Sequence, residues 1–268
     1  MDMLTHELTT LALCWRLERR DGVTVGLTAH DRALTVDGLE YRAAPGMMPS
    51  AVKRVAGLAA DTTDVAGALT SDALGEADLL AGRWDGARVV LFAVDWTGGP
   101  GRVDLGEGRL GAVSLEGGRF TAELSGAAAA LARPVVEETS PECRAELGDR
   151  RCRVPMAGRR RWARVLSAEG RTVTVDRSDA DDLYAGGRLR WFGGAGGGTE
   201  AWVAGSAGAM LTLRVAPGFA VTPGTLVELI EGCDKSLATC AGRFGNAVNF
   251  RGEPYLPGVD LLTRYPGA

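Results

Sequence analysis

Alternating apolar and polar positions dominate the first part of the chain. Residues 11–17 and 23–27 each place apolar side chains at every second position. This period of two is typical of β-strands with one buried face. The Arg-Asp-Gly triplet at 20–22 supplies a turn between them and predicts a β-hairpin. An Asp-Gly pair predicts a second hairpin, formed by residues 33–36 and 39–42.

Longer apolar stretches follow, separated by glycine-containing turns. Residues 88–96 contain the run Val-Val-Leu-Phe-Ala-Val and predict a buried strand. Residues 103–115 and 119–124 predict another hairpin, because two glycines lie between them. Short helices are expected at 73–80 and at 126–133, and a proline ends the second.

The pattern predicts a mainly β protein with four segments. Residues 1–133 form a β-rich domain, 134–159 a connector, 160–231 a small β-barrel, and 232–268 a tail. The connector and the tail have few periodic apolar residues, so we expect irregular chain that needs an anchor. The barrel strands are expected at residues 162–167, 172–176, 188–192, 201–204, 209–215 and 226–230.

Composition and charge narrow the class of protein. Of 268 residues, 46% are hydrophobic and 24% charged, which is typical of a globular chain and excludes disorder as its main state. The net charge of −4 gives no overall basic field for nucleic acid. The longest apolar runs, 89–94 and 127–132, are far shorter than the about 18–20 residues of a membrane span. The N-terminus has no basic region of a secretory signal, so we expect the protein to be made and folded in a reducing cytoplasm.

Four of the five cysteines lie in the two irregular segments. Cys143 and Cys152 belong to the connector, whereas Cys233 and Cys240 open the tail. Because a compact β module often begins and ends at neighbouring points, both pairs are expected to meet at the base of the barrel. Four thiols gathered in segments without a core are typical of a cross-linking metal site.

The spacing alone leaves the type of site open. Zinc knuckles place two to four residues between paired cysteines. Here eight residues separate Cys143 from Cys152, and six separate Cys233 from Cys240. This favours an iron–sulfur cluster over zinc only slightly, since a cluster accepts thiolates from looser loops. Two disulfides or four unconnected thiols are the alternatives, and Cys14 is interpreted as a small strand residue.

The tail carries a specific motif, and the N-terminal part a less specific one. Residues 61–69, 78–87 and 94–96 make up the N-terminal block. The tail motif consists of Cys233-Asp234-Lys235-Ser236, Cys240, Arg243-Phe244-Gly245-Asn246-Ala247-Val248-Asn249-Phe250-Arg251-Gly252, Pro254 and Pro257-Gly258. The tail motif and the N-terminal block resemble the baseplate hub proteins of siphophage-like tails and gene transfer agents. The resemblance covers nearly the whole chain.

The resemblance implies a structural protein of the tail baseplate, not an enzyme. It implies a tail-tube-like β-domain in a ring, expected as a trimer, that joins the distal tail protein to the central, megatron-like tip protein. Related tail-tip proteins bind an iron–sulfur cluster through cysteines. The implied cofactor is a 4Fe–4S cluster, and its implied ligands are Cys143, Cys152, Cys233 and Cys240.

A metal-dependent enzyme of the tail tip, acting on the cell wall or in redox chemistry, is the alternative function. Four thiolates would saturate a metal and leave no open position for substrate. The histidines are His6 and His30, and we expect His30 to serve a turn. Glu137-Glu138 and Asp181-Asp182 are interpreted as solvated loop faces.

An arginine-rich segment raises the question of contact with DNA that passes through a tail. Surface charge and compensation of the thiolates are the favoured interpretation, because a channel that conducts DNA should not grip its phosphates. The residues are Arg150, Arg151, Arg153, Arg159, Arg160, Arg161 and Arg164.

Overall fold

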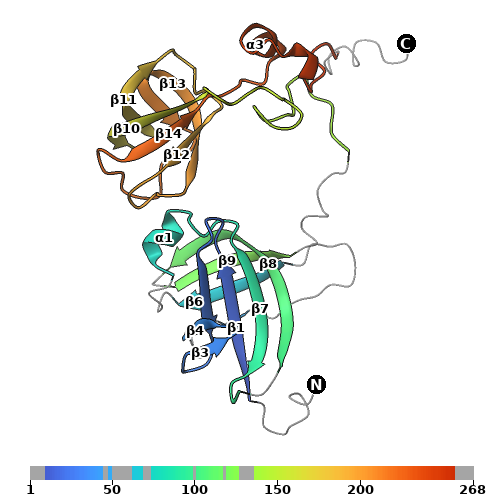
Figure 1. The fold of residues 1–268 in the computed structure, drawn as a ribbon, viewed down its shortest axis with the longest axis vertical. Coiled ribbons are helices and arrows are strands. Elements are labelled where there is room, and N and C mark those ends of the chain that lie inside the picture. Colours follow the sequence, from blue (N-terminus) through green and yellow to red (C-terminus); the bar gives the residue numbers. More distant parts are fainter. Residues whose placement is uncertain are drawn as a thin grey trace. The chain divides into compact units, whose positions relative to one another are not determined.

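A computed structural model describes residues 10–44, 48–49, 62–68, 74–98, 101–116, 119–126 and 136–256. The chain divides into two compact units, Met1–Val135 and Val136–Ala268. Strands dominate both units, as the ribbon shows (Figure 1). The prediction of a mainly β protein is therefore confirmed.

The first unit contains one curved sheet (Figure 1). In its described part the strand order is β3-β4-β2-β1-β7-β8-β9-β6-β5, and all pairs are antiparallel except β2 with β4. The strands are β1 (Leu11–Glu18), β2 (Thr24–Thr28), β3 (Leu34–Val36), β4 (Leu39–Ala43), β5 (Met48–Pro49), β6 (Thr62–Ala68), β7 (Arg88–Asp95), β8 (Arg102–Glu116) and β9 (Arg119–Gly126).

Both faces of the central strands are buried. Successive side chains of a strand point to opposite faces, so Trp15 enters one hydrophobic cluster and Cys14 the other. The first cluster also holds Trp84, and the second holds Tyr41 against Phe92. Cys14 is fully buried, as expected for a small strand residue. Burial on both faces explains why β7 is a continuous apolar run instead of an alternating one.

In the first unit, the hairpins that were predicted from glycine-containing turns are present in the structure. The three predicted hairpins are confirmed as β1–β2, β3–β4 and β8–β9. Asp37 and Gly38 both have positive φ, 51° and 78°, as a two-residue hairpin turn requires. Helix α1 (Glu76–Leu80) is shorter than predicted. The helix expected at 126–133 lies outside the described residues, except for Gly126, which ends β9.

The second unit is built around a closed barrel with the strand order β10-β11-β13-β12-β14 (Figure 1). Its interior is lined by twelve buried side chains, with Trp191 and Tyr184 among the largest. The strands are β10 (Arg160–Glu169), β11 (Thr172–Asp179), β12 (Arg188–Trp191), β13 (Glu200–Leu213) and β14 (Leu226–Ile230).

The barrel has five strands, whereas the sequence pattern predicted six. The segments expected at 201–204 and 209–215 are one strand, β13. The glycines between them do not end it. Instead, Gly208 takes a positive φ of 56° opposite Asp179, where the register with β11 shifts. A bulge of this kind bends a strand without interrupting it.

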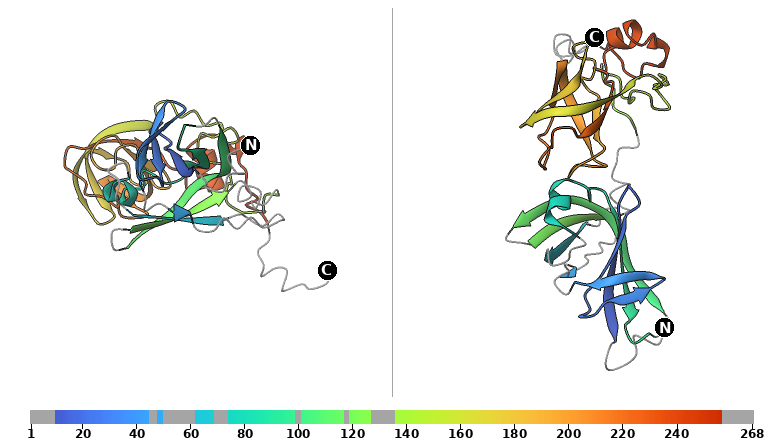
Figure 2. Two further views of the ribbon diagram at one scale, coloured as in Figure 1. Left: turned by 90° about the horizontal axis from the view of Figure 1, so that it is seen from below. Right: turned by 60° about the vertical axis from the view of Figure 1, so that its left-hand side comes forward.

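The connector and the tail lie beside one end of the barrel (Figure 2). The tail contains helix α3 (Leu237–Gly242) and a short 3₁₀ turn, η2 (Ala247–Asn249). The sequence predicted no helix there, because six residues are too few to show a helical period. The Ser236 side chain caps α3 by accepting from the N–H of Thr239 at 3.1 Å.

Candidate functional site

The connector and the tail are joined by backbone hydrogen bonds. The N–H of Cys143 donates to the carbonyl of Lys235 (2.9 Å), and the N–H of Arg144 donates to that of Arg251 (3.0 Å). The N–H of Glu253 reaches the carbonyl of Ser140 at 2.7 Å. Residues about 100 positions apart thus run side by side, with the thiols between them.

The structure brings the four predicted cysteines to one place. Burial raises the pKa of the Cys240 thiol, and the nearby thiols of Cys143, Cys152 and Cys233 raise it further. All four are free thiols in this structure. Cys152 and Cys240 are buried, and Cys143 and Cys233 are half-buried.

Three of the four sulfurs accept N–H hydrogen bonds. The backbone N–H of Lys235 donates to Cys233 Sγ and that of Arg251 to Cys143 Sγ, each at 3.4 Å. The side-chain amide of Asn246 lies 3.7 Å from Cys152 Sγ. Such donors stabilise thiolates and are the usual outer shell of metal–thiolate sites. The N–H of the neighbouring Gly232 donates to the carbonyl of Leu183 and not to a sulfur.

Asp149 shapes the loop that presents Cys152. Its carboxylate accepts from the N–H groups of Cys152 (2.6 Å), Arg151 (2.8 Å) and Glu146 (3.0 Å). Burial disfavours the ionised form, but these three donors outweigh it and lower the pKa of Asp149. The loop therefore keeps its form through a local polar network.

Ion pairs attach the site to its surroundings. The Arg144 guanidinium donates two hydrogen bonds, of 2.6 and 2.7 Å, to the Glu253 carboxylate. This ion pair joins the connector to the tail. At the end of the barrel, the buried carboxylate of Glu231 accepts from Arg159 at 2.7 Å and from Arg243 at 3.2 Å. Barrel, connector and tail are thereby linked around one carboxylate.

A small apolar cluster and a cavity flank the thiols. Ala145, Cys152 and Val154 are buried together, and Phe244 packs against them. On the barrel side, a cavity of about 270 Å³ is lined by Cys233 and Lys235 together with Arg188 and Trp202. The Arg188 guanidinium pairs with Glu146 at 2.6 Å and so ties the barrel to the connector. The thiols therefore lie between an apolar cluster around Val154 and Phe244 and a cavity that is lined by charged side chains.

The residues fit a thiolate-bound group by their chemistry. The donor set is four free thiols, three with N–H donors, in segments whose apolar cluster is small. In the part of the chain that the structure describes, no three His, Cys, Asp or Glu side chains are grouped as a site for one metal ion.

The other predicted side chains have structural partners. His30 Nδ1 accepts from the N–H of Arg32 at 3.0 Å, in the turn that follows β2. Glu137 pairs with Arg144 and Arg151, and Asp181 accepts from the N–H of Gly208. His6 lies outside the described residues. These contacts agree with the interpretation of His30 and the acidic pairs as turn and loop residues.

The arginine-rich segment is largely bound within the chain. Arg159 pairs with Glu231, and Arg160 pairs with the buried Glu228. Arg151 pairs with Glu137, and Arg164 donates to the carbonyl of Gly224. These arginines act as local supports of the connector and the barrel.

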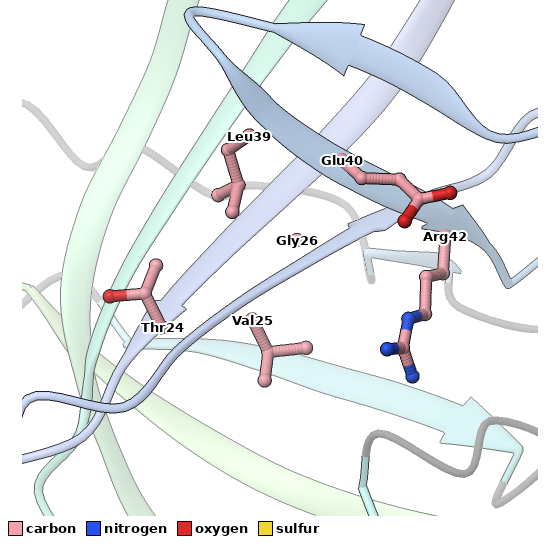
Figure 3. A pocket seen from close by; sticks show the side chains of 6 residues that line it. All are labelled: Thr24, Val25, Gly26, Leu39, Glu40 and Arg42. Carbon is pink, nitrogen blue, oxygen red and sulfur yellow. The ribbon is translucent and has the colours of Figure 1, made fainter.

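A cavity of about 360 Å³ lies in the first unit between β2 and β4 (Figure 3). Thr24 lies at one end of it, and Glu40 and Arg42 lie at the other (Figure 3). Gly26 allows β4 to approach closely, since an added Cβ would lie 2.8 Å from the carbonyl oxygen of Glu40. The lining residues include no thiol or imidazole.

Comparison with known proteins defines the class of this chain as a phage tail protein. Residues 1–155 match the family "Baseplate hub protein, N-terminal attachment domain", and residues 182–260 match "Phage conserved hypothetical protein BR0599". A chain in the solved structure "Virion of native gene transfer agent (GTA) particle" is 37% identical, with a TM-score of 0.85. The match covers 98% of this chain and 94% of that one. No curated protein matches.

The chain belongs to the baseplate hub protein family, because the family match covers more than half of its length. The predicted resemblance is thus confirmed for the family. The protein is a structural component of a phage-like tail and is located in the virion tail. No helix in the described ranges is long and apolar enough to cross a membrane.

Proposed function

We propose that this protein is the hub that joins the distal tail protein to the central tip protein of a phage-like baseplate. Three copies form the ring, and in each copy a 4Fe–4S cluster bound by Cys143, Cys152, Cys233 and Cys240 pins the tail to the connector. The observation that carries the proposal is that the two cysteine-bearing segments lie against each other. Cys143 bonds to Lys235 through the backbone, and Asn246 bonds to both Cys152 and Cys240.

The attachment role is supported at the level of the first unit. Its family is described as an N-terminal attachment domain, and the GTA virion chain resembles this one over nearly its full length. The first unit then binds the preceding ring, and the second unit presents the cysteine-bearing segments to the tip protein. The division of the chain into two compact units suits these two tasks.

A cluster is favoured over zinc by the family resemblance and by the spacing of the cysteines along the chain. Eight residues separate Cys143 from Cys152 and six separate Cys233 from Cys240, which is wider than in zinc knuckles. A cluster places several iron and sulfide atoms between its ligands and therefore takes more widely spaced thiolates. When bound, it supplies four iron–thiolate bonds that cross-link the two segments. Structural metal sites of this kind contribute folding free energy on the order of 10 kcal/mol, by analogy with zinc.

The chain's own residues prepare this site. Asp149 holds the loop of Cys152, and the Ser236 cap begins the helix that carries Cys240. The N–H groups of Lys235 and Arg251 orient the sulfurs of Cys233 and Cys143. Val154 and Phe244 exclude water from the side of Cys152. All four thiols are used as ligands, so the proposed role is structural and not catalytic.

Contact with DNA is a minor part of the proposal. The arginines of the 150–164 segment have partners within the chain at Arg151, Arg159, Arg160 and Arg164. These guanidinium groups are therefore already bound to groups of the same chain when DNA passes through the ring. Weak binding of DNA phosphates suits a channel through which DNA must move.

The test is the Cys233→Ser variant in the producing strain. We expect tails that stop before the tip is added, because the tail segment loses its anchor. Electron microscopy of purified particles and a count of infectious or transfer-competent particles give the readout. Cys14→Ala is the matched control, since Cys14 is buried in the other unit, and it should produce complete particles. Normal particles from Cys233→Ser would reject the proposed role.

A further inference from the structure

Asn246 touches both cysteine-bearing segments. Its backbone N–H donates to the carbonyl of Cys240 in α3 at 2.9 Å. Its side-chain Nδ2 donates to the carbonyl of Cys152 in the connector at 2.6 Å and lies 3.7 Å from Cys152 Sγ. One residue thus contacts one cysteine of each pair.

The orientation of the Asn246 amide follows from its partners. The carbonyl oxygen and the sulfur of Cys152 are both acceptors, so only the NH₂ end of the amide can face them. The other end, Oδ1, accepts from Asn249 Nδ2 at 2.7 Å. Asn249 in turn donates its backbone N–H to the carbonyl of Asn246 at 2.9 Å. The second asparagine therefore fixes which end of the first one faces the sulfur.

The donor at Cys152 differs from those at the other sulfurs. Cys233 and Cys143 accept from backbone N–H groups, which any residue at positions 235 and 251 would supply. Cys152 accepts from a side chain, so its donor can be removed by one substitution. Hydrogen bonds to thiolate sulfurs offset their negative charge, and in iron–sulfur proteins they set the reduction potential.

We propose that Asn246 positions Cys152 and tunes the metal centre through its N–H···S hydrogen bond, with Asn249 holding its amide in place. The inference rests on the proposed cluster. Removing the amide leaves more negative charge on the Cys152 sulfur, which lowers the reduction potential of the centre. It also frees the connector from the tail at Cys152, so the centre is lost more rapidly.

The experiment uses the full chain, purified without oxygen, in four forms: wild type, Asn246→Ala, Asn249→Ala and Val248→Ala. Val248 is the matched control, because it lies in the same 3₁₀ turn and its side chain is 91% exposed. Two quantities are measured: the midpoint potential, in a titration with dithionite, and the rate of bleaching by an iron chelator. The potential separates tuning from a merely structural role, which changes only the bleaching rate.

We expect Asn246→Ala to lower the midpoint potential and to bleach about 10-fold faster, the usual cost of losing an outer-shell partner. Asn249→Ala should shift both quantities in the same direction by less, and Val248→Ala should match the wild type. If Asn246→Ala does not retain the centre, the potential of Asn249→Ala decides. Potentials equal to that of the wild type in the variants overturn the inference. A colourless wild type overturns the proposed function instead.

Discussion

Glu253 shows how one exposed side chain contributes to the junction of connector and tail. Its hydrogen bonds from Arg144 lower the pKa of its carboxyl group to about 2, and the N–H of Ser140 adds to this. A group whose pKa is lower in the folded state stabilises that state above its unfolded pKa, here 4.5. This stabilisation is lost as the pH falls from about 4.5 to about 2.

The variant Glu253→Gln tests this contribution. Above pH 5 it should unfold at a lower urea concentration than the wild type, because the charge-assisted pair with Arg144 is gone. The difference should shrink as the pH falls through the window between about 4.5 and 2. Glu142→Gln, an exposed neighbour, is the control. A difference that stays constant down to pH 2 would contradict the assignment.

The residue scale also shows what the sequence can and cannot provide. That the two cysteine-bearing segments lie together could be predicted, because thiols are rare and these segments lacked a core. The donors to their sulfurs could not be predicted, because Lys235 and Arg251 act through backbone N–H groups that carry no sequence signal. Asn246 lay within the tail motif, but only the fold shows that it faces Cys152.

At the scale of elements, the sequence predicted hairpin turns correctly, but it did not show whether a glycine ends a strand or lies within one. The Asp-Gly pair at 37–38 specifies a hairpin through local backbone conformation, and the structure contains it. Gly208 has a similar local signal but serves as a bulge inside β13, because the strand pairs with β12 before this glycine and with β11 from it onward. Helix α3 depends on its Ser236 cap and on its position beside the connector more than on its own sequence.

The close approach of tail and connector makes Gly252 a critical position. An added Cβ there would lie 2.6 Å from the carbonyl oxygen of Glu142. Gly252→Ala should therefore lower the free energy of unfolding of the second unit by about 1–3 kcal/mol, as overpacking does. Gly242→Ala is the matched control, because no atom lies within 4 Å of an added Cβ there.

Urea unfolding of the purified full chain compares these two glycine variants. The control should keep or slightly raise the stability, since alanine suits the last residue of α3 better than glycine. If Gly252→Ala were as stable as the wild type, the backbone of the tail could move away from Glu142 without loss of folding free energy, and the prediction would be wrong.

At the scale of the whole molecule, the chain divides into two compact units that differ in how their parts are stabilised. The first unit has two buried clusters of its own and matches an attachment family. In the second unit the barrel has its own core, whereas the connector and the tail share only a small apolar cluster. The prediction that the barrel brings its two ends together could be made from chain order. The polar network around Glu231 that secures this junction could not, because it needs three distant segments.

The most direct measurement is the visible absorption spectrum of the full chain purified without oxygen, together with its iron and sulfide content. The account predicts a brown protein with about four iron and four sulfide per chain. Serine at any one of positions 143, 152, 233 or 240 should remove most of the colour, whereas Cys14→Ala should keep it. A colourless protein that contains zinc, or one that keeps its iron without these thiols, would contradict the account.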